Sequence, residues 1–116
     1  MSTIQSVARF KIHSGKLEEL KRVAAQCMQL AREKDTGTLR YELFFNADQT
    51  ECVVHEEYVD SEACIQHFRN MGEVSTAIFA TSDVSGEMWG NPSPELRKAV
   101  QDKDVQLFAP FLSLNE

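Results

Sequence analysis

Two kinds of hydrophobic spacing alternate along this chain, and they constrain its fold more than any other feature. Four segments have the alternation, or the aromatic and β-branched content, that is typical of strands: residues 3–12, 38–46, 51–59 and 82–89. Two others, residues 16–34 and 61–71, place apolar side chains three and four positions apart, as helices with one buried face do. The predicted order is therefore strand, helix, strand, strand, helix, strand.

Residues that start and stop helices flank the two helical segments. Ser14 is placed to cap the first helix, and Gly37 is placed to end it. Asp60 is placed to cap the second helix, which Gly72 should break. Residues 73–80 then add a short helical segment before the last of the four strands.

The tail of the chain adds a further helix and strand. Ser93 as the cap and Pro94 at the first helical position predict a short helix that ends near Val100. Residues 105–112 read as a strand, which Pro110 restricts to a sheet edge or ends early. We expect this apolar strand to pair with an edge, either of its own sheet or of a partner's.

The element order predicts an α+β fold of the ferredoxin-like split β-α-β type. Right-handed crossovers give a four-stranded antiparallel sheet with both helices on one face. Both faces of the two central predicted strands carry apolar or aromatic residues, so the sequence leaves open which face meets the helices. Because a bare sheet face with such residues is typical of an association surface, we expect a homodimer in which two sheets pack face to face as an α+β barrel.

Composition and charge exclude several classes of protein. The 116 residues, 42% hydrophobic and 26% charged, argue against disorder and fit a single domain over residues 1–116. A net charge of −6 without a basic cluster disfavours nucleic acid as a partner. The first residues lack a secretory pattern and no apolar run is long enough to span a bilayer, so we expect no membrane association. Three widely spaced cysteines favour a reducing cytoplasm over a disulfide framework.

One stretch, GTLRYELFFNADQTECVVHEEYVDSEACIQHF, carries a specific set of motifs. It has a Leu-x-Tyr-x-Leu strand, a strand that ends in Glu-x-aromatic, an acidic helix cap, and a helix with His-Phe: Leu39, Tyr41 and Leu43; Glu56 and Tyr58; Asp60; His67 and Phe68. Together with the opening VARFKIHSGKLEEL, this pattern resembles the antibiotic-biosynthesis monooxygenase (ABM) family. The resemblance covers residues 4–89, which divides the chain into a family-like core of about residues 3–89 and a C-terminal extension, residues 90–116.

The resemblance implies a dimeric ferredoxin-like barrel. Several family members oxidise phenolic or quinol substrates with dioxygen and need no metal or flavin, whereas others degrade haem or have no known role. The haem-degrading branch has an Asn before the Arg of the first strand and a Trp at the end of the third strand. Here Ala8 precedes Arg9 and Tyr58 stands near the Trp position, so only the helix histidine, His67, matches that branch.

His67 is the leading candidate for chemistry. It lies three residues after Cys64 and four before Met71, beside the apolar face of its helix. A neutral imidazole there could take the proton of a phenolic hydroxyl, and the resulting anion could react with dioxygen. The alternative is a histidine at the edge of the core whose ring bonds a backbone carbonyl.

Glu56 and four aromatic residues are the candidates for substrate binding. The rise per residue of helix and strand places Glu56 near His67 if Glu56 faces the helices, where it would orient the ring. The alternative for Glu56 is an ion pair across the sheet or at the dimer surface. A flat aromatic pocket would use Tyr41, Tyr58, Phe68 and Trp89, although aromatic residues in such numbers also build ordinary cores.

Two hypotheses for function follow, from different classes. The first, which the family resemblance implies, is a cofactor-independent monooxygenase that oxidises a small phenolic or quinol substrate with dioxygen. The sequence itself shows no metal-ligand spacing and no nucleotide-binding motif. The second is a non-catalytic dimeric module of the same fold that binds a small molecule or serves a stress response. The first predicts an enclosed apolar pocket with a few polar groups, and the second predicts a filled space beneath the second helix.

Overall fold

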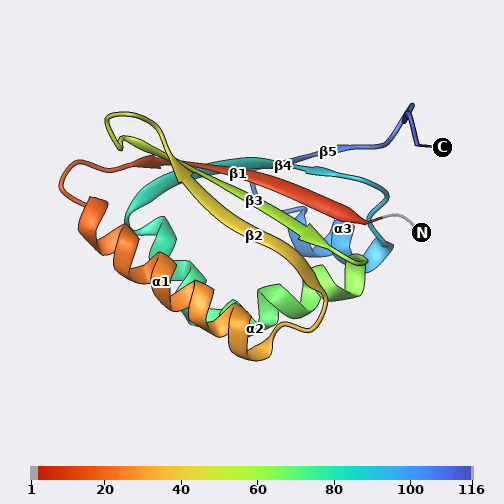
Figure 1. The fold of residues 1–116 in the computed structure, drawn as a ribbon, viewed down its shortest axis with the longest axis horizontal. Coiled ribbons are helices and arrows are strands. Elements are labelled where there is room, and N and C mark those ends of the chain that lie inside the picture. The colour runs from red at the N-terminus through yellow and green to blue at the C-terminus, as the bar shows by residue number, and fades with distance from the viewer. Residues whose placement is uncertain (1–2, 116) are drawn as a thin grey trace.

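The computed structural model describes residues 3–115, and within that range it contains five β-strands and three α-helices (Figure 1). In chain order they are β1 (Ile4–Ile12), α1 (Leu17–Lys34), β2 (Thr38–Phe45), β3 (Glu51–Tyr58), α2 (Ser61–Phe79), β4 (Ser82–Trp89), α3 (Pro94–Val100) and β5 (Val105–Phe108). The α+β ferredoxin-like prediction is confirmed, with α1 and α2 together on one face of the sheet (Figure 1).

The sheet differs from the prediction at its far edge. Its order is β2-β3-β1-β4-β5, and the first four strands pair antiparallel as expected. The fifth strand, β5, pairs in parallel with β4 of the same chain, so the sheet is five-stranded and mixed rather than four-stranded and antiparallel. Strand β5 ends at Phe108 instead of residue 112, shortly before Pro110, whose missing N–H cannot extend a ladder.

Strand register decides which side chains face the helices. In β1 and β3 the even-numbered residues point toward α1 and α2, whereas in β2 the bulge after Thr38 brings the odd-numbered residues, such as Tyr41, to that face. Tyr41 thus pairs with Glu56 across the two strands, and both sit beneath the helices. The opposite face of the sheet carries a mixture of polar and apolar side chains: Val7, Phe44, Val53, His55, Trp89 and Phe108.

The helix ends match the sequence signals in part. Asp60 caps α2 as predicted, because its carboxylate accepts from the Ala63 N–H at 2.9 Å. Helix α1 begins after Lys16 without a side-chain cap, so the expectation for Ser14 is wrong. Gly72, at φ 47° and ψ −132°, breaks the helical geometry inside α2 as predicted, and a further helical segment continues to Phe79. A positive φ of this kind is open to glycine at little cost, which explains why the chain can turn there and resume the helix.

Two regions of the core matter for the site. The loop after α1 packs tightly on α2, since a Cβ at Gly37 would lie 2.6 Å from the Ala63 Cβ. Helix α3 of the extension buries Leu96 and Val100 in the same cluster as Tyr58. The first contact fixes the end of α1 against α2, and the second makes the extension part of the folded core.

Candidate active site

His67 of α2 is bonded to a carboxylate from the end of α1. Its side chain is 4% exposed, and its Nδ1 lies 2.7 Å from Oδ2 of Asp35, whose own side chain is 3% exposed. Asp35 is the residue that ends α1, and its extended backbone turns the chain toward β2. The alternative in which this ring bonds a backbone carbonyl is not what the structure shows at Nδ1, because the Asp35 side chain takes that position.

Asp35 accepts two further hydrogen bonds. The Thr38 hydroxyl donates to Oδ2 at 2.7 Å, and the Asn70 amide donates to Oδ1 at 2.8 Å. Burial alone would raise the pKa of Asp35, but the hydrogen bonds from Asn70, His67 and Thr38 outweigh it and hold the pKa below its ordinary value. Asp35 is therefore an ionised acceptor at neutral pH.

Glu56 of β3 lies on the other side of the imidazole. Its Oε1 is 3.9 Å from His67 Nε2, and the Tyr58 hydroxyl donates a hydrogen bond to the same oxygen. Burial raises the pKa of Glu56, although the nearby His67 and the Tyr58 hydroxyl partly offset that rise. Glu56 thus lies near His67, as the rise per residue of helix and strand predicts. The carboxylate that bonds the ring, however, is Asp35 and not Glu56.

Three aromatic rings surround the imidazole. The Tyr41 ring meets it edge-on at a centroid distance of 5.0 Å, and the rings of Tyr58 and Phe68 lie at 5.5 and 6.4 Å. Burial raises the pKa values of Tyr41 and Tyr58, so both hydroxyls stay protonated and can act as hydrogen-bond donors. The imidazole is therefore enclosed by aromatic rings, two of which carry hydroxyl groups that can donate hydrogen bonds.

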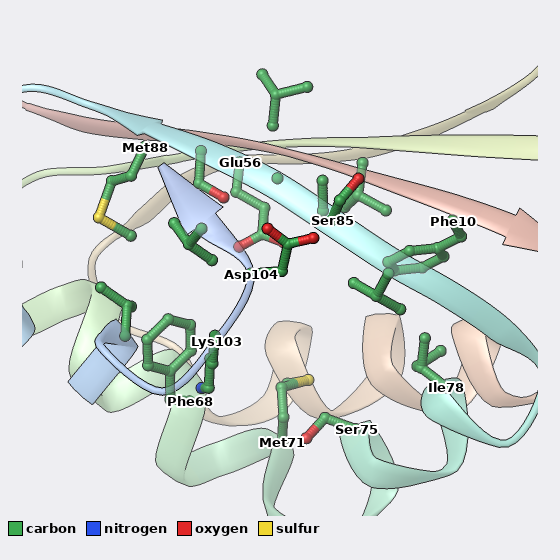
Figure 2. Close-up of a pocket in the computed structure, with 18 of the residues that line it drawn as sticks. Phe10, Glu56, Phe68, Met71, Ser75, Ile78, Ser85, Met88, Lys103 and Asp104 are labelled. Atoms are coloured by element: carbon green, nitrogen blue, oxygen red, sulfur yellow. The ribbon is translucent and has the colours of Figure 1, made fainter. Parts of the chain in front are cut away.

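A cavity of about 520 Å³ lies between the sheet and the helices, which is a size suited to a drug-sized ligand. Figure 2 shows Glu56 reaching from the sheet toward the interior, with Phe10, Met71 and Ile78 on the surrounding elements. Four of the predicted site residues contribute to its wall: Tyr41, Glu56, His67 and Phe68.

The other two predicted aromatic residues lie elsewhere. Of the described side chains that border the cavity, none belongs to Tyr58 or Trp89. Tyr58 is fully buried behind Glu56. Trp89 follows the buried Met88 and so points to the opposite face of the sheet, where its ring lies 6.4 Å from that of His55. The prediction that Trp89 lines the pocket is wrong because strand residues alternate between faces.

Two groups of residues in the site were not predicted from the sequence. The first is Asp35 with its donors Thr38 and Asn70, for which the only local signal is an Asp at a helix end followed by small polar residues. The second comes from the extension, where the loop between α3 and β5 supplies Lys103 and Asp104 to the cavity wall. The Lys103 ammonium lies 4.5 Å from the centre of the Phe68 ring, and Figure 2 shows the two side by side.

Across residues 3–115, no cluster of three or more His, Cys, Asp or Glu side chains has the arrangement of a metal site. In the same range, none of the helices combines the length and the apolarity needed to cross a bilayer.

A model of the family named "Antibiotic biosynthesis monooxygenase" matches residues 3–78, which is more than half of the chain. The chain belongs to the ABM family. The match includes Asp35, Glu56 and His67, so the buried array lies within the family core of this ABM protein. No curated protein sequence matches the chain significantly.

Several solved structures have the same fold as this ABM chain, and one of them covers more of it than two others do. MupZ from Pseudomonas fluorescens is 22% identical with a TM-score of 0.86, and the match covers 98% of this chain and 94% of MupZ. Rv0793 from Mycobacterium tuberculosis is 20% identical with a TM-score of 0.69, covering 79% of this chain and 97% of Rv0793. SnoaB, a cofactor-independent oxygenase from Streptomyces nogalater, is 21% identical with a TM-score of 0.68, covering 80% of this chain and 96% of SnoaB. A match over 98% of the chain includes most of the extension, so MupZ shares that part of the fold.

Proposed function

We propose that this protein is a cofactor-independent monooxygenase that oxidises a small phenolic or quinol substrate with dioxygen. The observation that carries the proposal is the 520 Å³ cavity whose wall combines apolar side chains with the two titratable side chains His67 and Glu56. Membership of the ABM family supports the reaction class, and SnoaB is an example of a cofactor-independent oxygenase with the same fold. Apolar walls with a few convergent polar groups are typical of small-molecule sites.

In the proposed reaction His67 accepts the proton of the substrate's phenolic hydroxyl. The resulting anion is electron-rich and passes electrons to dioxygen without a metal or flavin. On an anthrone-type ring, one oxygen atom replaces two ring hydrogens as a new carbonyl, and the other leaves as water. The substrate thus supplies all four electrons that reduce dioxygen, and the protein supplies proton transfer and orientation.

The alternative, a non-catalytic binding module, predicts a filled space beneath α2 and a His67 bonded to backbone. Two observations favour the enzyme instead. The space beneath α2 is a cavity, and the His67 ring is bonded to a buried carboxylate rather than to a carbonyl. Burying the two carboxyl groups of Asp35 and Glu56 on either side of one imidazole is costly for stability, which is typical of sites that perform chemistry.

We also propose that two copies pair through the sheet face opposite the helices. That face carries exposed apolar rings, including Phe44, Trp89 and Phe108, and membership of a family whose members are commonly dimers supports the proposal. Light scattering coupled to size-exclusion chromatography tests the dimer, and a monomer at every concentration would refute it.

The three cysteines are free and buried, in keeping with a reducing cytoplasm. The packing of α3 into the core supports a single domain over residues 1–116.

Oxygen uptake tests the proposed reaction. An electrode records uptake with a panel of hydroquinones and anthrones for the wild type, for His67→Ala, and for His13→Ala as a control. His13 pairs with Asp83 at the surface at 2.9 Å and should not affect turnover. We expect uptake in the wild type and the control, without added metal or flavin, and its loss in His67→Ala. Equal uptake in all three proteins would remove His67 from the reaction.

A further inference from the structure

The loop that carries Asp35 is fastened to α2 at several points. Both the backbone N–H and the hydroxyl of Thr36 donate to the Gln66 side-chain oxygen, at 2.9 and 3.1 Å. Gly37 packs directly on Ala63, with no space for a side chain. These contacts bind the residue after Asp35 to the helix turn that carries His67. The Asp35 carboxylate is therefore held in place by the fold and does not reach His67 by a chance rotamer.

The hydrogen bonds of Asp35 decide which imidazole nitrogen carries the proton. An ionised carboxylate only accepts, so the nitrogen that faces it must be an N–H. That nitrogen is Nδ1 of His67, at 2.7 Å. In the neutral ring the other nitrogen, Nε2, is then an acceptor that can take up a proton. Nε2 is the atom that faces Glu56.

The space between Nε2 and Glu56 is suited to a hydroxyl. The two atoms are 3.9 Å apart, too far for a direct hydrogen bond. A hydroxyl oxygen beside that gap can lie about 2.8 Å from both, so one substrate group can bond the imidazole and the carboxyl together. The Tyr58 hydroxyl holds Glu56 from behind, and both Glu56 and His67 border the cavity.

We propose that Asp35 is the positioning residue of this site, which fixes the proton of His67 on Nδ1 so that Nε2 and Glu56 act as a proton-transfer pair on one substrate hydroxyl. The proposal rests on the proposed function for its reaction, but its structural part concerns the protein alone. It adds a role for Asp35, and it makes Glu56 a partner in proton transfer rather than a binding group only.

Titratable or charged groups reach the site from most of the elements around it. They are Cys27 from α1, Asp35 after its end, Tyr41 from β2, His55, Glu56 and Tyr58 from β3, Cys64 from α2 itself, Glu87 from β4, and Asp102, Lys103 and Asp104 from the loop before β5. Burial raises the pKa of Cys64 to about 12 and also raises the pKa of Cys27, so neither thiol ionises near neutral pH. The groups that can exchange protons directly beside the imidazole are therefore the carboxyls of Asp35 and Glu56. Asp35 already accepts three hydrogen bonds, which leaves Glu56 for proton exchange.

Nitrogen NMR of the His67 ring tests the structural part of the proposal without any substrate. Two-bond nitrogen–proton correlations on the wild-type protein distinguish the two neutral tautomers. We expect the proton on Nδ1 in the wild type and a mixed or reversed tautomer in Asp35→Ala. Asp35→Asn should restore the wild-type tautomer in part, because an amide oxygen still accepts from Nδ1. The matched control is Asp83→Ala, which removes the carboxylate from the exposed pair with His13 and should leave His67 unchanged.

Kinetics of the same variants test the functional part. Asp35→Ala should lower kcat at least about tenfold and change KM less, because the loss lies in proton transfer rather than in binding. Asp35→Asn should recover part of that kcat. A wild-type proton on Nε2 would overturn the proposal, and the wild-type spectrum alone decides this even if Asp35→Ala fails to fold. Normal kcat in a folded Asp35→Ala would also overturn it.

The two proposals fail in distinguishable ways. No oxygen uptake by the wild type, combined with the expected tautomer, would refute the monooxygenase reaction and leave the assignment of Asp35 intact. Oxygen uptake that depends on His67, combined with an unchanged tautomer in Asp35→Ala, would refute the assignment and leave the reaction intact.

Discussion

Asp35 and Glu56 are two carboxyls on either side of one imidazole, and the fold shifts their pKa values in opposite directions. Both are buried, which by itself raises the pKa of each. Asp35 receives three hydrogen bonds, and its pKa falls, whereas Glu56 receives one, from Tyr58, and its pKa stays raised. Burial is the largest influence on both pKa values. The three donors outweigh it at Asp35, whereas the single donor and the nearby His67 ring do not outweigh it at Glu56.

Among the substitutions that test this difference between the two carboxyls, Asp35→Ala should have the largest effect. That effect is on the stability of the fold. The substitution leaves the hydroxyl of Thr38 and the amide of Asn70 without their acceptor inside the fold. We expect the free energy of unfolding to fall by about 3–5 kcal/mol, as when one partner of a buried pair is removed. Urea unfolding followed by circular dichroism measures the loss. Asp83→Ala, at an exposed pair, should cost less than about 1 kcal/mol, and equal losses in the two variants would contradict the structural weight given to Asp35.

Glu56→Gln should affect turnover more than stability. An amide has nearly the shape of the carboxyl and still accepts from Tyr58, but it cannot exchange a proton. We expect kcat to fall by about 100-fold, within the range typical of a lost acid–base group. The free energy of unfolding should change by less than about 1.5 kcal/mol. An unchanged kcat would return Glu56 to a binding role only.

The two carboxyls should change the pH dependence of stability in opposite directions. The pKa of Asp35 is lowered on folding, so its contribution is present above its ordinary value of 3.8 and is lost as the pH falls through the lower folded pKa. The pKa of Glu56 is raised, so folding is penalised progressively as the pH rises from its ordinary value of 4.5 through the higher folded pKa. Relative to wild type, Asp35→Asn should therefore recover stability toward low pH, and Glu56→Gln should gain stability toward high pH. Urea unfolding between pH 3 and pH 8 checks both trends, and parallel curves for the two variants would contradict the comparison.

The smallest expected effect comes from the extension. Lys103 lies over Phe68 at the cavity wall, an interaction worth about 0.5–1 kcal/mol at an exposed position. Lys103→Met should keep the side-chain length and raise KM for ring substrates by less than about fivefold, while kcat stays unchanged. Steady-state kinetics checks this, with Lys98→Met on α3 as the control. A large fall in kcat would place Lys103 in the chemistry instead.

The fold was predictable where hydrophobic period and cap residues agree. Strand alternation, the cap at Asp60 and the pair Ser93–Pro94 gave element boundaries close to those observed. Strand β5 was recognised but not placed, because a lone apolar strand can pair with any free edge. Its parallel pairing with β4 depends on where α3 docks, and that docking is a tertiary contact of Leu96 and Val100.

The site was predictable to the extent that residues lie close in sequence or share a periodic face. His67 and Glu56 were brought together by helix and strand rise, and Phe68 and Tyr41 by their positions beside them. Trp89 was misplaced because the sequence did not decide which face of β4 meets the helices. Asp35 was missed because it lies 32 residues from His67, at a helix end where an aspartate has no distinctive spacing.

Carbon NMR titration of the two carboxyls tests the central claim most directly. Asp35→Asn and Glu56→Gln identify the two side-chain signals in the protein labelled with carbon-13. We expect the Asp35 carboxyl to titrate below its ordinary value of 3.8 and the Glu56 carboxyl to titrate above its ordinary value of 4.5. Titration of Glu56 below Asp35 would contradict this, because the carboxyl beside Nε2 would then be the more acidic of the two.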